Sequence, residues 1–403
     1  MNTMLQRLSR VTTSGKFISE IDGLRFIAIG TVVLFHLAVN LQIKAPLGYP
    51  MPAEGNLLAA VARHGFRGVE LFFIISGFIL GFPFAGHFLL GRKKVRLGEY
   101  FLRRVTRLEP PYFLCMVLLF LISGAVGRTT LADAAPHLAA SLVYMHNLVF
   151  GGENIINNVA WSLEIEIQFY LLVPVLSLVF AIRRKSIRRA TIVGIGLTTV
   201  MAEWLWIDES SPLYLTIVRF LHFFLVGFLL ADVYLVDWKE HPSRAWRWDL
   251  LSVAGWPLLF ALWNSPEISR VLVPGGTLPL LPAVLFPVLA FTLYMAAFRG
   301  PITNRILTNA WVTTIGGMCY TIYLFHNQLI GFLTGITSQV VPTNAYTVNV
   351  LIQMTMVIPP MLAACALYFA LVERPCMRKD WPRRLTEWVR VRVHGNRNVE
   401  TSV

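Results

Sequence analysis

Apolar residues along the chain gather in segments long enough to cross a membrane, separated by short polar stretches. A membrane-spanning helix needs about 20 mostly apolar residues, and the chain contains ten segments that approach or exceed this length. They cover residues 23–42, 68–88, 108–126, 161–182, 190–207, 213–236, 249–264, 278–298, 310–332 and 347–372. The pattern therefore predicts an all-α polytopic membrane protein of about ten transmembrane helices.

Two of these segments are less regular than the others. Segment 249–264 is short and contains Pro257, and segment 278–298 contains Pro282 and Pro287. Residues 131–150 form a further apolar stretch, for which we expect an interfacial or re-entrant helix.

The composition agrees with a membrane protein. Of 403 residues, 56% are hydrophobic and 14% are charged, whereas soluble domains carry roughly 25% charged residues. A net charge of +13 would suggest nucleic-acid binding in a soluble protein, but here the positive residues lie in short loops, so we expect no nucleic-acid partner. The four cysteines form no CxxC pair, and no histidine has metal-ligand spacing to them. We therefore expect neither a disulfide framework nor a metal site.

The loop charges predict the orientation of the chain in the membrane. Lys and Arg are concentrated in alternate loops: 91–107, 183–189, 239–247, 299–305 and 374–384. The intervening loops are poor in positive charge, apart from the 43–67 loop. The positive-inside rule places both termini and the basic loops in the cytoplasm. We expect a cytoplasmic N-terminal segment over 1–19, a ten-helix membrane domain over 20–378 and a basic cytoplasmic tail over 379–403.

Several ionisable residues lie inside the predicted spans at a similar depth. His36 lies thirteen residues from the cytoplasmic start of the first span, about 20 Å into a hydrocarbon core about 30 Å thick. On four other spans, the residues at a comparable level are Glu70, Glu164, Glu166, Arg219 and His326. Ionisable groups in hydrocarbon are costly and indicate functional sites by default. Their convergence predicts a shared cavity.

Each of these residues also has a structural interpretation. A single intramembrane histidine often hydrogen-bonds neighbouring helices, and a glutamate near a helix end can reach the interface. Glu164 and Glu166 are two positions apart and therefore lie on nearly opposite helix faces. We expect Glu164 to be structural.

Arg25 lies eleven residues before His36. This spacing is close to three helical turns, so both residues share one helix face, about 16 Å apart along the axis. Arg25 would lie at the cytoplasmic end of a path through the protein, and His36 at its outer end. Nearby in the predicted cytoplasmic layer, Arg103, Arg104 and Arg107 begin the third span. Guanidinium groups bind phosphate bidentately, so this cluster is suited to a polyphosphate cofactor; the alternative is an anchor for anionic lipid.

Motifs along nearly the whole chain, from Glu20 to about Arg378, resemble those of one family. They are "EIDGLRFIAIGTVVLFH", "GFRGVELFFIISGF", "RRVTRLEPPY", "AWSLEIEIQFY", "CYTIYLFH" and a terminal "VERP". In this order they resemble the acyltransferase-3 membrane proteins, bacterial O-acyltransferases that modify sugars of surface polysaccharides and related glycans. We interpret "VERP" as a helix end before Pro375 rather than as a catalytic site at Glu373.

The resemblance implies a multi-pass protein of the bacterial inner membrane. It implies an O-acetyltransferase of polysaccharide biosynthesis, with acetyl-CoA or another acyl-CoA as the cytoplasmic co-substrate. The acceptor would be a hydroxyl of an exopolysaccharide, O-antigen or related glycan, or of a lipid-linked sugar. By position, the family's functional residues correspond to His36 as the catalytic histidine, Arg25 as its partner, Arg104 and Arg107 near the donor, and the acids Glu70 and Glu166. Two positions depart from the family: Ile167, where relatives often have a second acid, and Glu164, where they often have a small polar residue.

The mechanism expected from these residues is general-base catalysis. His36 would take the proton from a sugar hydroxyl as it attacks the thioester, with Glu70 or Glu166 orienting the imidazole. A covalent acyl-histidine intermediate is an open alternative. The remaining predicted roles are donor phosphate binding by Arg25, Arg103, Arg104 and Arg107, and acceptor binding by Arg219 and His326.

Two other classes of protein remain open at this stage. A proton-coupled secondary transporter of a polar or lipid-linked solute would also place polar residues at mid-membrane, although no internal repeat is visible. A non-catalytic scaffold is disfavoured by the cost of its buried charges. Binding of acyl-CoA would separate the enzyme from the transporter.

Overall fold

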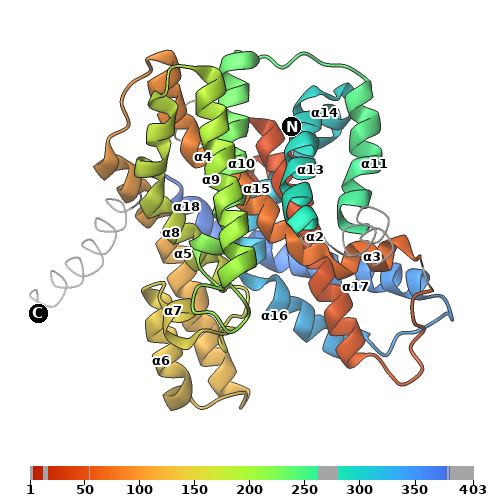
Figure 1. Cartoon of the computed structure of the whole chain (residues 1–403). Helices are drawn as coiled ribbons and strands as arrows, with labels where there is room; N and C mark the ends of the chain where they lie inside the picture. Colours follow the sequence, from red (N-terminus) through yellow and green to blue (C-terminus); the bar gives the residue numbers. More distant parts are fainter. Residues whose placement is uncertain (1–2, 12–16, 54, 262–279, 379–380, 382–403) are drawn as a thin grey trace, which may run out of the picture.

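The computed structural model describes residues 3–11, 17–53, 55–261, 280–378 and 381, and every regular element within these ranges is a helix (Figure 1). The predicted all-α class is thus confirmed. The longer helices are α2 (Ser19–Lys44), α4 (Gly68–Leu90), α5 (Leu97–Ala125), α8 (Trp161–Leu176), α9 (Lys185–Trp206), α10 (Ile217–Asp232), α11 (Arg247–Ala261), α13 (Leu280–Arg299), α16 (Cys319–Thr337) and α17 (Tyr346–Tyr368).

Shorter helical elements connect or extend these. They are α1 (Thr3–Leu8), α3 (Leu57–Arg63), η1 (Gly65–Arg67), α6 (Leu131–Leu142), α7 (His146–Phe150), η2 (Ser177–Ala181), η3 (Val233–Asp237), α14 (Pro301–Leu307), α15 (Ala310–Gly317), η4 (Phe369–Glu373) and α18 (Arg374–Cys376). The expected helix in 131–150 is present as α6 and α7. In Figure 1 these two helices lie at one end of the molecule and α14 lies at the other.

Each of the ten predicted spans contains a helix, but six helical stretches of the described chain are long and apolar enough to cross a membrane. They are Ser19–Lys44, Gly65–Leu90, Leu97–Ala125, Trp161–Ala181, Ile217–Asp237 and Tyr346–Cys376. A seventh is counted if the bent pair Ala283–Arg299 and Pro301–Leu307 forms one span. The predicted segment 310–332 is not one helix: it breaks at Met318, directly after Gly316 and Gly317, into α15 and α16. Residues 262–264 and 278–279 of the predicted spans, and the predicted tail apart from Trp381, lie outside the described residues.

The centre of the bundle is the contact between α4 and α10. A Cβ atom on Gly77 would lie 2.0 Å from the carbonyl oxygen of Phe224, and one on Gly227 would lie 2.2 Å from that of Ile74. Only glycine allows the two backbones to approach this closely, as is common between membrane helices. Around this contact, the ring of Phe224 stacks on that of Phe73 at 4.7 Å and on that of Phe169 at 4.0 Å.

Helix α2 packs against α4, α15 and α16. It is continuous from Ser19 to Lys44, so Arg25 and His36 do lie on one helix. This packing brings the first of the predicted motifs against the "CYTIYLFH" motif of α16.

Candidate functional site

Two histidines from opposite ends of the chain lie side by side. The ring centroids of His36 on α2 and His326 on α16 are 4.9 Å apart, with the rings at 63°. His326 is fully buried, and its Nδ1 lies 2.8 Å from the carbonyl oxygen of Tyr323 and 3.1 Å from that of Ile322. Because a carbonyl oxygen only accepts hydrogen bonds, Nδ1 carries the proton. The Nε2 of His326 is then the basic nitrogen, and it is buried with no hydrogen-bond partner among the described residues.

Amide side chains, rather than carboxylates, surround this histidine pair. Asn327 contacts the ring of His36. Its amide nitrogen lies 2.7 Å from Oδ1 of Asn158, and its own Oδ1 accepts from Asn40, which also donates to the carbonyl of His36 at 2.8 Å. These amide residues were not among those predicted from the sequence. The polar pair Asn327–Gln328 inside an apolar segment is the signal that could have revealed them.

Glu70 has no hydrogen bond or ion pair with His36 among the described residues, so its role in orienting that ring stays a prediction. Its carboxylate lies 3.1 Å from Nη1 of Arg67, one turn earlier, and within electrostatic range of Arg219. The Nε of Arg219 in turn lies 2.9 Å from Oε1 of Glu203, and its guanidinium lies 3.9 Å from the ring centroid of Tyr214. Glu70, Arg67, Arg219 and Glu203 thus form one group of opposite charges.

Glu166 also has no hydrogen bond or ion pair with His36 in the described structure. It accepts a hydrogen bond of 2.6 Å from the hydroxyl of Ser76 and lies within electrostatic range of both Arg25 and Tyr323. The ring of Tyr323 is 5.6 Å from that of His326. Glu166 is therefore within electrostatic range both of Arg25 and of the tyrosine that lies against His326.

Glu164 has the structural role that we expected. Its buried carboxylate accepts hydrogen bonds from the backbone N–H groups of His146 and Asn147, at 3.2 Å and 2.8 Å. It thereby satisfies two of the unpaired donors at the start of α7. His146 itself lies against His137, with 2.8 Å between Nε2 and Nδ1. Burial and the proximity of His137 lower the pKa of His146 to about 4.

Three of the predicted arginines converge at the start of α2 and α5. Arg107 lies within electrostatic range of Arg25 and Arg104, and the Nε atoms of Arg104 and Arg107 are buried without a hydrogen-bond partner among the described residues. Arg25 forms an ion pair of 2.6 Å with Asp22. Arg103 is placed differently: 42% of its side chain is exposed, and its Nε donates to the carbonyl of Glu99. Its guanidinium is thus exposed to solvent, unlike the buried Nε atoms of Arg104 and Arg107.

Glu373, which we interpreted as part of a helix end, also connects η4 to α16. Its carboxylate accepts hydrogen bonds from the backbone N–H and the hydroxyl of Thr321, in the first turn of α16. It also lies within electrostatic range of Arg107 and Arg25. This residue links the "VERP" motif to the start of the helix that carries His326.

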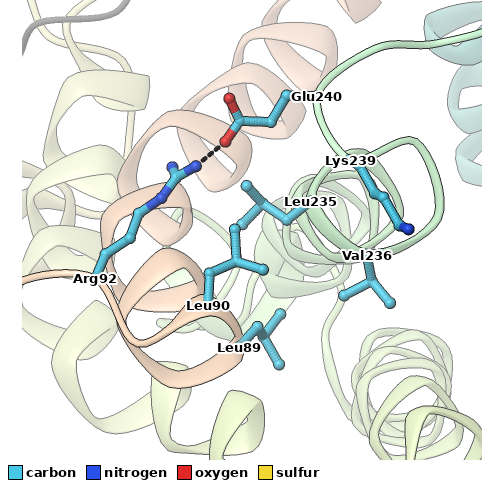
Figure 2. A pocket seen from close by; sticks show the side chains of 7 residues that line it. All are labelled: Leu89, Leu90, Arg92, Leu235, Val236, Lys239 and Glu240. Atoms are coloured by element: carbon cyan, nitrogen blue, oxygen red, sulfur yellow. Dashed lines mark hydrogen bonds and ion pairs between the residues drawn. The ribbon is translucent and has the colours of Figure 1, made fainter.

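A cavity of about 440 Å³ lies elsewhere, where the end of α4 meets η3 (Figure 2). Its apolar lining is formed by leucine and valine side chains, and the ion pair between Arg92 and Glu240 lies on one side of it. None of the predicted site residues lines this cavity, which is therefore separate from the histidine pair. Its lining residues are Leu89, Leu90, Arg92, Leu235, Val236, Lys239 and Glu240.

Comparison with known proteins identifies the family. A model of an acyltransferase domain matches residues 18–372, from the start of α2 into η4. The chain belongs to the acyltransferase-3 family. The matched range contains every predicted site residue.

Two curated relatives are O-acetyltransferases by name. The peptidoglycan O-acetyltransferase OatA of Listeria monocytogenes is 27% identical over 352 residues, which cover 80% of this chain and 50% of the relative. The O-acetyltransferase OatA of Staphylococcus aureus is 25% identical over 362 residues, which cover 84% of this chain and 55% of the relative. The chain thus spans about half the length of these relatives. No solved structure matches it.

Proposed function

We propose that this acyltransferase moves an acetyl group from cytoplasmic acetyl-CoA to a sugar hydroxyl of an exopolysaccharide, O-antigen or related glycan at the outer face of a bacterial inner membrane. The family and the names of the relatives support acyl transfer to a glycan. The buried arginines support a phosphate-bearing donor. The acceptor is a polymeric glycan or its lipid-linked precursor.

The proposed topology has ten spans with both termini in the cytoplasm. Six helices have the length and apolar character of spans, and α9, α11, the bent pair of α13 and α14, and the broken pair of α15 and α16 complete the set. In this topology residues 1–19 and 379–403 flank a membrane domain over 20–378. Arg25, Arg104 and Arg107 then face the cytoplasm, where acyl-CoA is available.

The observation that carries the proposal is the histidine pair, in which Nε2 of His326 is unprotonated and has no hydrogen-bond partner in the part of the chain that the structure describes. An alcohol needs a positioned base to attack near neutral pH. His36 takes the proton of the sugar hydroxyl, whose oxygen attacks the thioester carbonyl carbon; the carbon–sulfur bond breaks, and the proton passes from His36 to the departing thiolate. The Nε2 of His326 accepts a hydrogen bond from the acceptor, and Asn327 holds the ring of His36. Asn327 thus takes the orienting role that we first gave to Glu70 or Glu166.

The donor extends along α2 from the arginines to His36. Arg25, Arg104 and Arg107 bind its phosphates, and the exposed Arg103 adds positive charge at the entrance. The phosphopantetheine arm then covers the separation of about 16 Å between Arg25 and His36. Glu166 lies beside this path and offsets part of the arginine charge. On the other side of the histidines, Glu70 and Arg219 contact the acceptor.

The test is acetyl-CoA binding and turnover by the purified, membrane-reconstituted full chain. We expect the wild type to release free CoA slowly in the absence of an acceptor, and His36→Ala to bind acetyl-CoA without turnover. His241→Ala is the matched control, because His241 is exposed in a loop. If the folded wild type binds no acyl-CoA of any chain length, the donor assignment fails and a proton-coupled carrier becomes the better account.

A further inference from the structure

The segment before the first span is part of the folded domain. Helix α1 packs against α15 and η4, and Leu5 is buried. Arg374 holds the end of this segment: its Nε donates to the carbonyl of Ser9 at 3.1 Å, and its Nη2 donates to that of Gln6 at 3.2 Å. Residues 3–11 are thereby placed next to the cluster of buried arginines.

Arg10 reaches from this segment into the cluster. Its Nε lies 3.3 Å from Oδ2 of Asp22, while Nη1 of Arg25 lies 2.6 Å from Oδ1 of the same carboxylate. The side chain of Asp22 is 1% exposed and that of Arg10 is 14% exposed. Arg10 also lies within electrostatic range of Arg107. Arg10 and Arg25 share the single carboxylate of Asp22, so the two arginines together retain an excess positive charge.

Gly316 at the end of α15 makes room for this arrangement. A Cβ on Gly316 would lie 1.8 Å from the carbonyl oxygen of Asp22, and one on Gly317 would lie 3.7 Å from Cβ of Arg10. Because α15 carries no side chain at Gly316, the backbone of α2 packs directly against its end, while Arg10 lies at ordinary contact distance beside Gly317. The two glycines lie directly before the break at Met318.

We propose that Arg10 is a further donor-binding residue, which contacts a phosphate group of acyl-CoA; this rests on the proposed function. In the structure Asp22 acts as the counter-ion of Arg10. When donor binds, a phosphate oxygen takes this place beside Arg10, and Asp22 stays with Arg25. The two ion-pair distances support this exchange of partners, because Asp22 lies closer to Arg25 than to Arg10.

The experiment compares two thioesters, acetyl-CoA and S-acetylpantetheine, which lacks the phosphates. With Arg10→Gln we expect kcat/KM for acetyl-CoA to fall about 10-fold or more, mainly through KM, as expected for loss of a hydrogen bond to a charged group. With S-acetylpantetheine the variant and the wild type should be equal. Arg10→Lys, which keeps the charge, should recover part of the loss. Arg7→Gln, exposed on α1, is the matched control.

The possible outcomes separate this proposal from the proposed function. An unchanged KM for acetyl-CoA in Arg10→Gln, or an equal loss with both thioesters, overturns the role of Arg10 while the enzyme remains an acyl-CoA transferase. A wild type that turns over neither thioester overturns the proposed function and this inference with it. A drop in melting temperature of Arg10→Gln that Arg10→Lys does not share, without selectivity between the thioesters, assigns Arg10 to folding.

Discussion

The ring of His36 lies 4.9 Å from that of His326, and the backbone of α16 determines which nitrogen of His326 is basic. Two carbonyl groups accept from Nδ1, so Nε2 has a lone pair in a buried position. A base held in this tautomer needs no rearrangement before it accepts a hydrogen bond. Such preorganisation is what the proposed role of the histidine pair in catalysis requires.

His326→Asn tests the role of Nε2. The asparagine amide can still donate to the carbonyl of Tyr323, but the second nitrogen is lost. We expect kcat/KM for the acceptor to fall at least about 10-fold, with the slow release of CoA from acetyl-CoA in water retained. The measurement is a rate series at varied acceptor and at varied donor. Equal loss of both reactions would show that His326 acts on the donor instead.

Arg104→Gln and Arg107→Gln test the donor site. We expect each to raise the KM for acetyl-CoA by about 10-fold to 100-fold, because each removes a charge-assisted hydrogen bond in a buried position. Arg103→Gln should have a weaker effect, since its exposed guanidinium is screened by water. Arg96→Gln, exposed before α5, is the control. If Arg103→Gln has the largest effect of the three, phosphate binds outside the bundle.

Glu164→Gln tests the structural role of that carboxylate. The substitution weakens two hydrogen bonds to the start of α7, and we expect the free energy of unfolding to fall by about 1–3 kcal/mol. Donor affinity per folded molecule should not change. Thermal denaturation of reconstituted protein measures the first effect. Glu153→Gln, exposed in the loop between α7 and α8, is the control. Unchanged stability together with lost turnover would instead make Glu164 part of the active site.

Acid is expected to destabilise the region of α6 and α7. The pKa of His146 is lowered to about 4 in the folded protein, below the unfolded value of about 6.5. The folded state thus favours the neutral ring, and its contribution to stability is complete above about pH 6.5 and is lost as the pH falls towards 4. The melting temperature should fall over this window, and by less in His146→Gln. An equal fall in both proteins would assign the acid sensitivity to other groups.

Gly316→Ala tests the contact between α2 and α15. The added methyl group would meet the backbone of Asp22 at 1.8 Å, so the helices must separate, at a cost of about 1–3 kcal/mol. We expect a lower melting temperature and weaker acetyl-CoA binding, because Asp22 and Arg25 move together. Gly335→Ala on α16, where a Cβ meets no atom within 4 Å, should change neither. Equal behaviour of the two variants would contradict the close packing.

The sequence by itself determined the properties that depend on near neighbours along the chain. Runs of apolar residues produced an all-helical membrane protein, and the spacing of Arg25 and His36 placed both on one face of one helix, because helical geometry repeats every few residues. The separation of Glu164 from Glu166 onto different faces followed for the same reason. Ordered motifs were enough to predict the family.

Only the tertiary structure decided which polar groups meet. Asn40 bonds to Asn327 across 287 positions of the chain, and His36 meets His326 by the same contact of α2 with α16. Helical periodicity predicts depth along each helix but not which helices are neighbours, and residues at equal depth can face different partners. Glu70 therefore pairs with Arg67, and Glu166 bonds to Ser76. Arg10 reaches Asp22 where Gly316 lets α2 approach the end of α15.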